Sequence, residues 1–200
     1  QRFTQQLYLD LTGFHRILDG RAYLNPDPQI RYNGDGTGTA SGVEMLIRYE
    51  LDERFFGWVH YTFTYARLQD GPNALDRRSD HNQTHNGGLT LGFKLKPTLQ
   101  ISTRFRYVSG MPFSVTPLSI FDSDRGQFSP TNGPVNTLRY QDFHQLDLRL
   151  DYTLTFERWQ LLTYIQLNNL YGYRAEERAL YTPIESGLDP TTLKSWPSWV

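Results

Sequence analysis

Polar and apolar side chains alternate without interruption along residues 145–156. Every second residue from Leu146 to Phe156 is Leu, Tyr or Phe, and the residues between them are Asp, Arg or Thr. Neighbouring residues of a β-strand point to opposite faces, so this segment has one apolar and one polar face. Ten steps of about 3.3 Å, tilted by about 45°, cover roughly 23 Å, close to the apolar thickness that a membrane-spanning strand crosses.

The same alternation recurs and predicts a chain of antiparallel strands. Seven strands are expected, at about residues 6–12, 43–51, 59–66, 88–96, 99–107, 145–156 and 159–168. Tight reversals are expected at residues 52–54, 96–98 and 157–158. Long connections rich in Gly, Pro, Asn and Asp are expected at residues 18–41, 71–85, 111–139 and from 172 onward. Short and long connections therefore alternate, as in an outer-membrane barrel with short periplasmic turns and longer extracellular loops.

Composition narrows the class of protein. The chain has 200 residues, a net charge of −1, 38% hydrophobic residues and no cysteine. Its mean hydropathy is −0.57, and no run approaches the roughly 18 apolar residues of a transmembrane helix. This excludes a helical membrane protein but leaves a β-barrel open, because alternating strands average to a polar-looking value. The near-zero charge gives no sign of a nucleic-acid partner.

Aromatic side chains gather near the predicted strand ends. Phe55, Phe56 and Trp58 follow one reversal, and Phe156 and Trp159 flank another. A second group lies where strands meet long connections: Tyr65, Tyr107, Tyr140, Phe143, Tyr171 and Tyr173. Aromatic rings are enriched at the depth of lipid headgroups, so two belts are expected.

A soluble antiparallel sandwich also has alternating strands, with one face in a core and one in water. Ordinary strands run to about 5–6 residues, shorter than those expected here. A sandwich also has no reason to place all its long loops at one end. The sequence therefore favours an all-β fold, an antiparallel transmembrane β-barrel.

Six segments have distinctive sequences at predicted strands or strand entries. They are residues 36–44 (GTGTASGVE), 55–65 (FFGWVHYTFTY), 78–86 (RSDHNQTHN), 104–113 (RFRYVSGMPF), 144–151 (HQLDLRLD) and 165–171 (IQLNNLY). These segments resemble strands and strand entries of TonB-dependent outer-membrane receptors, and they cover nearly the whole chain in the order of that family. One departure is Asn82, which stands where the family usually has Asp.

The resemblance implies a fold and a function. Residues 1–200 would be the C-terminal third of a roughly 22-stranded plugged barrel, with the plug domain and the final strand outside this chain. The protein would sit in the bacterial outer membrane and import a siderophore, vitamin, sugar or peptide. Its expected partners are lipid, the rest of the barrel, the plug, the substrate, and TonB through an upstream TonB box. No cofactor and no enzyme activity are expected.

Charged residues on the polar faces of the strands are the candidate site. They are Glu44, Arg48, Glu50, Arg104, Arg106, Asp147, Arg149 and Asp151. They either contact the plug or substrate, or form a polar barrel wall whose opposite charges pair across neighbouring strands. Arg104 and Arg106 could hold an anionic group, although a carboxylate such as Asp147 on a nearby strand could match them instead.

Other candidates lie in the long connections. Tyr32, Phe113, Phe121 and Phe128 could stack on a substrate, or pack loop on loop. Asp80, His81 and His85 carry metal-ligating groups, but in an extended segment the two His would lie about 13 Å apart. We expect them to cap a loop and expect no metal.

No catalytic motif is present in the sequence. Two alternatives remain open beside the importer: a passive porin or structural barrel, and an outer-membrane hydrolase with a Ser/His pair facing lipid or a loop cleft.

Overall fold

The computed structural model describes residues 6–25, 29–50, 54–114, 119–122, 127–130, 135–179, 182–184, 187–189 and 193–195. Their regular secondary structure consists of β-strands. No helix long and apolar enough to cross a membrane occurs in this part of the chain.

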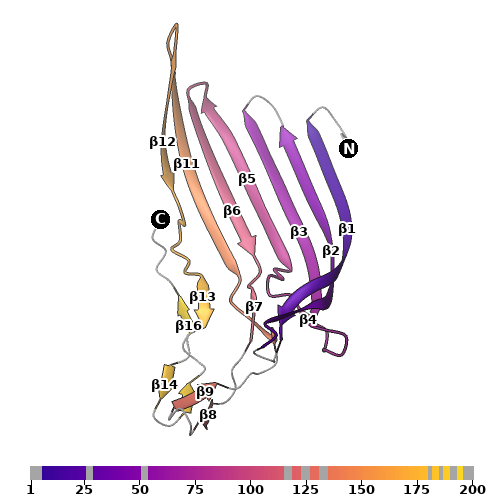
Figure 1. Cartoon of the computed structure of the whole chain (residues 1–200). Coiled ribbons are helices and arrows are strands. Elements are labelled where there is room, and N and C mark those ends of the chain that lie inside the picture. The colour runs from indigo at the N-terminus through magenta and orange to yellow at the C-terminus, as the bar shows by residue number, and fades with distance from the viewer. Residues whose placement is uncertain are drawn as a thin grey trace.

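One antiparallel sheet dominates the molecule and follows chain order (Figure 1). Its long strands are β1 (Leu7–Leu24), β2 (Tyr32–Glu50), β3 (Phe55–Gln69), β5 (His85–Lys96), β6 (Leu99–Val108), β11 (Phe143–Thr155) and β12 (Gln160–Leu167). The short strand β4 (Arg77–Arg78) pairs with β3. The sheet is a single open layer, with β1 and β12 at its edges.

Four small two-stranded sheets lie at the long-loop end, at the bottom of Figure 1. The strand β7 (Pro112–Phe113) pairs with β10 (Leu138–Arg139), and β8 (Ser119–Asp122) pairs with β9 (Gln127–Pro130). Near the C-terminus, β13 (Glu176–Ala179) pairs with β16 (Leu193–Ser195), and β14 (Thr182–Ile184) with β15 (Gly187–Asp189).

The register gives the sheet two chemically different faces. Residues that oppose each other in antiparallel strands share a face. One row across the sheet is Leu9, Ile47, Val59, Leu89, Phe105 and Leu146. The next row, on the other side, is Asp10, Leu46, His60, Gly88, Arg106 and Gln145. We call these sides the apolar face and the polar face.

No second layer covers the apolar face. Among the described residues, Leu68 and Pro112 are the only buried residues with an apolar side chain larger than a methyl group. A soluble sandwich would bury this face against another sheet, so the sandwich interpretation is wrong. The all-β antiparallel fold, the seven long strands and the tight reversals at residues 96–98 and 157–158 are confirmed. Most of the reversal expected at residues 52–54 lies outside the described residues.

The connection expected at residues 18–41 is wrong in extent. It is largely the continuation of β1 and β2, which are 18 and 19 residues long. The glycines that suggested a loop serve close packing instead: a Cβ on Gly38 would lie 2.7 Å from the Leu68 side chain. Glycine in a strand often marks such an approach.

Candidate functional site

The charged residues predicted to line the barrel interior all lie on the polar face. Arg48 opposes Trp58, and Arg104 opposes Asp147, in the same antiparallel registers that define this face. The set is Glu44, Arg48, Glu50, Arg104, Arg106, Asp147, Arg149 and Asp151.

Asp147 is the anchor of the polar face. Arg104 Nε and Nη2 donate to Asp147 Oδ2 at 3.2 and 2.8 Å. Asp147 Oδ1 accepts hydrogen bonds from Gln145 Nε2 at 2.6 Å and from the backbone N of Asn169 at 3.0 Å. The pairing of Arg104 with Asp147, expected from the charge pattern, is confirmed. It joins β6, β11 and the residues after β12.

Two other ion pairs run along a strand instead of across strands. Arg48 pairs with Glu50, and Arg149 with Asp151, with a shortest N–O distance of 2.7 Å in the second pair. The Arg149 guanidinium also lies 4.0 Å from the ring centroid of Tyr164. For these four charges the expected cross-strand pairing is wrong, because the next same-face residue of the same strand already supplies the opposite charge.

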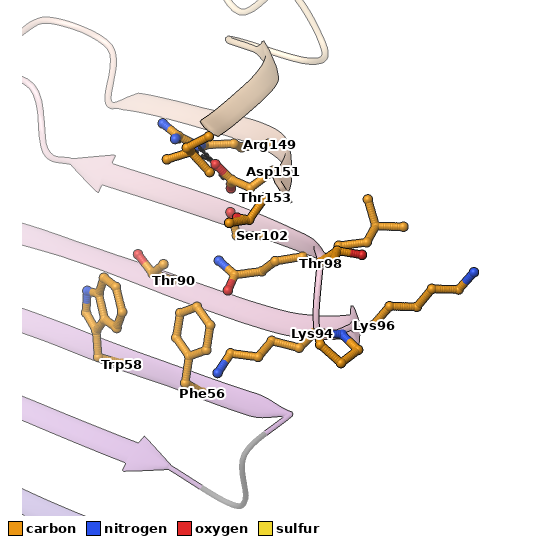
Figure 2. A pocket seen from close by; sticks show the side chains of 14 residues that line it. Phe56, Trp58, Thr90, Lys94, Lys96, Thr98, Ser102, Arg149, Asp151 and Thr153 are labelled. Atoms are coloured by element: carbon orange, nitrogen blue, oxygen red, sulfur yellow. Dashed lines mark hydrogen bonds and ion pairs between the residues drawn. The ribbon is translucent and has the colours of Figure 1, made fainter. Parts of the chain in front are cut away.

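A groove of about 450 Å³ opens on the polar face beside the turn between β5 and β6 (Figure 2). The rings of Phe56 and Trp58 stack on one side, with centroids 6.1 Å apart. Lys94 extends toward Phe56, whereas Lys96 points away from the groove (Figure 2). Gly92 makes room, because a Cβ there would lie 2.1 Å from the Phe56 ring.

This arrangement corrects one expected aromatic belt. Phe56 and Trp58 lie on the polar face, and only Phe55 of that cluster lies on the apolar face. Phe156 and Trp159 stack on each other at the turn between β11 and β12, with centroids 3.8 Å apart.

The belt at the long-loop end is largely an apolar-face feature. Tyr61 and Tyr107 lie in one row with His144. Tyr61 is hydrogen-bonded to His85, and Tyr171 to His144, at 2.7 and 2.6 Å. Hydroxyl groups with partners beside apolar ring bodies suit the depth of lipid headgroups. Phe143 departs from this pattern, because the register puts it on the polar face.

A cluster of charged residues lies at the long-loop end of the sheet. Arg77 bonds Asp70 at 2.5 Å and Asp80 at 2.7 Å, and Arg21 also bonds Asp70. Burial raises the pKa of Asp70, but the hydrogen bonds from Arg77 and Arg21 outweigh it and hold the pKa below its ordinary value. The pKa of Asp80 is also lowered. Burial raises this pKa, but the hydrogen bonds from Asn136 and Arg77 lower it by more. Both carboxylates are therefore held ionised.

Arg139 ties the two internal long loops together. Its Nη1 donates to the carbonyl oxygens of Asn82 at 2.7 Å and Gly110 at 2.8 Å, and its Nη2 donates to Thr84 Oγ1 at 2.8 Å. Asn82 is 1% exposed, and its amide is best oriented to donate to Thr64 O and accept from Arg139. Burial, and to a smaller degree the nearby Arg78, lowers the pKa of Arg139.

Asn136 makes a second tie between the same loops. Its Nδ2 donates to the Arg78 carbonyl at 2.9 Å and to Asp80 Oδ1 at 2.6 Å. Its backbone is in the left-handed region, with φ of 58°, which Asn tolerates better than most residues. Sequence reasoning missed Asn136, Arg139 and the Arg77 cluster. The signals in the sequence were Asn82, which departs from the family pattern, and Asp80, which was expected to cap a loop.

The loop aromatics have differing surroundings. Tyr32 is 56% exposed at the start of β2, with Arg31 over its ring at 5.7 Å. Phe113 stacks on Tyr140 with centroids 4.5 Å apart, which fits packing of loop on loop. Phe121 and Phe128 oppose each other between β8 and β9, and their side chains lie outside the described residues.

Two of the three residues weighed for a metal site, Asp80 and His85, have structural partners. Asp80 bonds Arg77 and Asn136, and His85 bonds Tyr61. No group of three or more potential ligands comes together among the described side chains. Loop capping therefore accounts for Asp80.

One Ser–His contact bears on the hydrolase alternative. His15 Nδ1 lies 2.8 Å from Ser41 Oγ, on the apolar face. A catalytic pair also needs a group that orients the base and donors for an oxyanion. In the part of the chain that the structure describes, no further hydrogen bond to the His15 ring is found. The contact is a cross-strand polar pair.

The comparisons with known proteins agree with this architecture. A protein-family model described as TonB dependent receptor-like, β-barrel, matches residues 2–170. A search among curated proteins finds no match.

Two solved structures resemble the chain. One is FpvA of Pseudomonas aeruginosa bound to heterologous pyoverdines, at a TM-score of 0.59 and 19% identity, covering 90% of this chain and 22% of that chain. The other is the FrpB iron transporter from Neisseria meningitidis, at 0.61 and 15% identity, covering 86% of this chain and 26% of that chain. The chain thus spans about a quarter of each, and the likeness concerns the fold.

Proposed function

Because the chain belongs to the TonB dependent receptor-like β-barrel family, we propose that it forms part of the wall of a receptor that imports a scarce nutrient across the bacterial outer membrane. The observation that carries this proposal is a single-layer sheet with a lipid-compatible face backed by a charged face, in the family's order. The family's proteins are receptors for transport and not enzymes.

In the complete receptor, residues 1–200 would be the C-terminal portion of the barrel. The plug, the remaining strands and the segment that binds TonB would come from the rest of the polypeptide. The apolar face would meet lipid, and the polar face would meet the plug or the passing substrate. Ion pairs such as Arg104–Asp147 would keep that wall polar without leaving charges unmatched.

The test uses the full-length receptor in a bacterium that lacks its own copy. Uptake of a radiolabelled panel is measured, comprising ferric siderophores, a vitamin, an oligosaccharide and a peptide, with and without TonB. Ferric complexes are tested first because the FpvA structure is of an iron complex and FrpB is described as an iron transporter. Uptake of one class that needs TonB and the proton-motive force supports the proposal.

The passive porin is separated by conductance. The purified receptor is placed in a planar bilayer without TonB. An importer closed by its plug conducts little, whereas a porin conducts ions freely. Open-channel conductance together with TonB-independent uptake would refute the import proposal.

A further inference from the structure

Arg106 is a cation of the polar face whose charge is only partly matched. Its Nη2 lies 3.8 Å from Asp147 Oδ2, too far for a hydrogen bond. Both oxygens of Asp147 already accept from other donors, with Arg104 on Oδ2 and Gln145 on Oδ1. Two guanidinium groups therefore share one carboxylate.

The Nε of Arg106 is shielded from solvent and has no hydrogen-bond partner among the described residues. A buried, unpaired N–H costs free energy, so the side chain is incompletely satisfied in this arrangement. The side chain as a whole remains 40% exposed, with its guanidinium 5.8 Å from the ring centroid of Phe143. Part of the side chain is therefore open to the polar face.

The cross-strand neighbours of Arg106 supply no second anion. Arg106 opposes Gly88 on β5 and Gln145 on β11, and neither residue carries a charge. The His60 ring lies over Gly88, because a Cβ there would be 2.4 Å from its Cε1. The next carboxylate in this row, Asp10, is four strand spacings away, about 19 Å at about 4.8 Å each.

We propose that Arg106, with Arg104 and His60 beside it, forms a subsite on the barrel interior for a carboxylate group. The carboxylate would belong either to the polypeptide that fills the barrel or to a substrate in transit. A carboxylate suits the terminal N–H groups of a guanidinium, which present parallel donors. The inference rests on the proposed function, since the polar face encloses an interior only in the complete barrel.

The test measures how fast phenylglyoxal modifies individual arginines of the full-length receptor in detergent, by peptide mass spectrometry. Acetate is the probe, and acetamide is its uncharged control. Arg48 serves as the internal reference, because Glu50 already pairs with it. Labelling is repeated in urea that displaces the plug but leaves the barrel folded.

If the polypeptide supplies the carboxylate, phenylglyoxal labels Arg106 slowly without urea and faster in urea, and acetate slows the labelling in urea again. If a substrate supplies it, Arg106 reacts at rest and acetate protects it without urea. In either case we expect acetate, and not acetamide, to slow the labelling of Arg106 by about threefold or more relative to Arg48. A rate that acetate changes in neither state overturns the inference.

This labelling does not depend on transport. A receptor that imports its nutrient with TonB but shows no acetate effect at Arg106 refutes the subsite alone. A receptor that fails to import while acetate protects Arg106 refutes the proposed function alone.

Discussion

Arg104 on β6 and Asp147 on β11 oppose each other directly, with 2.8 Å between Nη2 and Oδ2. The Asp147 side chain is 4% exposed, whereas the Arg104 side chain is 49% exposed. The buried member of the pair therefore depends on its partners more than the exposed member does. Removing charge from Asp147 and removing charge from a surface carboxylate should have very different costs.

We predict that Asp147→Asn lowers the free energy of unfolding of the full-length receptor by about 1–3 kcal/mol. The amide removes the charge and presents N–H donors to groups that donate to Asp147 now. Unfolding in urea, followed by tryptophan fluorescence in detergent micelles, measures the change. Glu50→Gln is the matched control on the same face, in an exposed pair that should contribute about 1 kcal/mol or less. Equal losses of unfolding free energy in the two variants would show that Asp147 contributes no more to stability than an exposed carboxylate.

The two faces of β11 give a second prediction. Leu148 lies on the apolar face in register with Thr103 and Leu167, and Arg149 lies on the polar face. Leu148→Arg should cost roughly 2–4 kcal/mol of unfolding free energy in a lipid bilayer, because it places a charge against the hydrocarbon. Arg149→Leu should cost less. A folding titration in which Arg149→Leu is the more damaging change would mean that the faces are assigned the wrong way round.

Sequence was sufficient for the strands and their faces because a strand between lipid and water keeps a period of two for its whole length. The stretch from Gln145 to Phe156 illustrates this: its alternation predicted the strand and put Asp147 on the same face as Arg104, where the two residues pair. The hairpin of β1 and β2 was underestimated for a physical reason. Gly36 and Gly38 look like loop residues, yet they lie where neighbouring side chains and backbone approach closely.

The contacts between the loops at the long-loop end of the sheet could not be predicted from the sequence. Its bonds join residues far apart in the chain, such as Asn136 with Asp80 and Arg139 with Thr84. The two loops that carry these residues have no periodic pattern. The hydrogen-bond acceptors are carbonyl oxygens and short side chains, which any loop contains. Contacts of this kind follow from how the loops fold back over the strands.

Arg139 should be the main determinant of order in these loops. Arg139→Lys keeps a positive charge but cannot reach three acceptors from one planar group, so it should not restore the wild-type state. Hydrogen–deuterium exchange of residues 79–85 and 109–114 in the full-length receptor is expected to rise by about tenfold, equivalent to about 1.4 kcal/mol of local stability. Arg78→Ala, at an exposed neighbouring position, is the control. Unchanged exchange in Arg139→Lys would contradict a clamp that depends on the guanidinium.

Acidification should loosen the Arg77 cluster. Because the pKa values of Asp70 and Asp80 are lowered in the folded protein, their contribution to stability is complete above the ordinary Asp pKa of about 3.9. It is lost as the pH falls through the folded-state values. Exchange of residues 66–80, corrected for intrinsic pH dependence, should therefore rise as the pH falls below about 3.9. Asp70→Asn should raise exchange at neutral pH and flatten this pH dependence, and an identical pH profile in both proteins would refute the assignment.

Gly110 should tolerate no side chain. A Cβ at this position would lie 1.9 Å from the carbonyl oxygen of Tyr140, and backbone cannot yield as a flexible side chain can. The same residue donates its N–H to Asp142 at 3.0 Å and accepts from Arg139 at 2.8 Å, so any shift also strains the clamp. Gly110→Ala should lower the unfolding free energy of the full-length receptor by about 1–3 kcal/mol. Gly13→Ala is the matched control, because open space surrounds its Cβ position and Ala is favoured over Gly in a strand. Were both variants as stable as the wild type in urea, the close packing of residue 110 against residue 140 would be disproved.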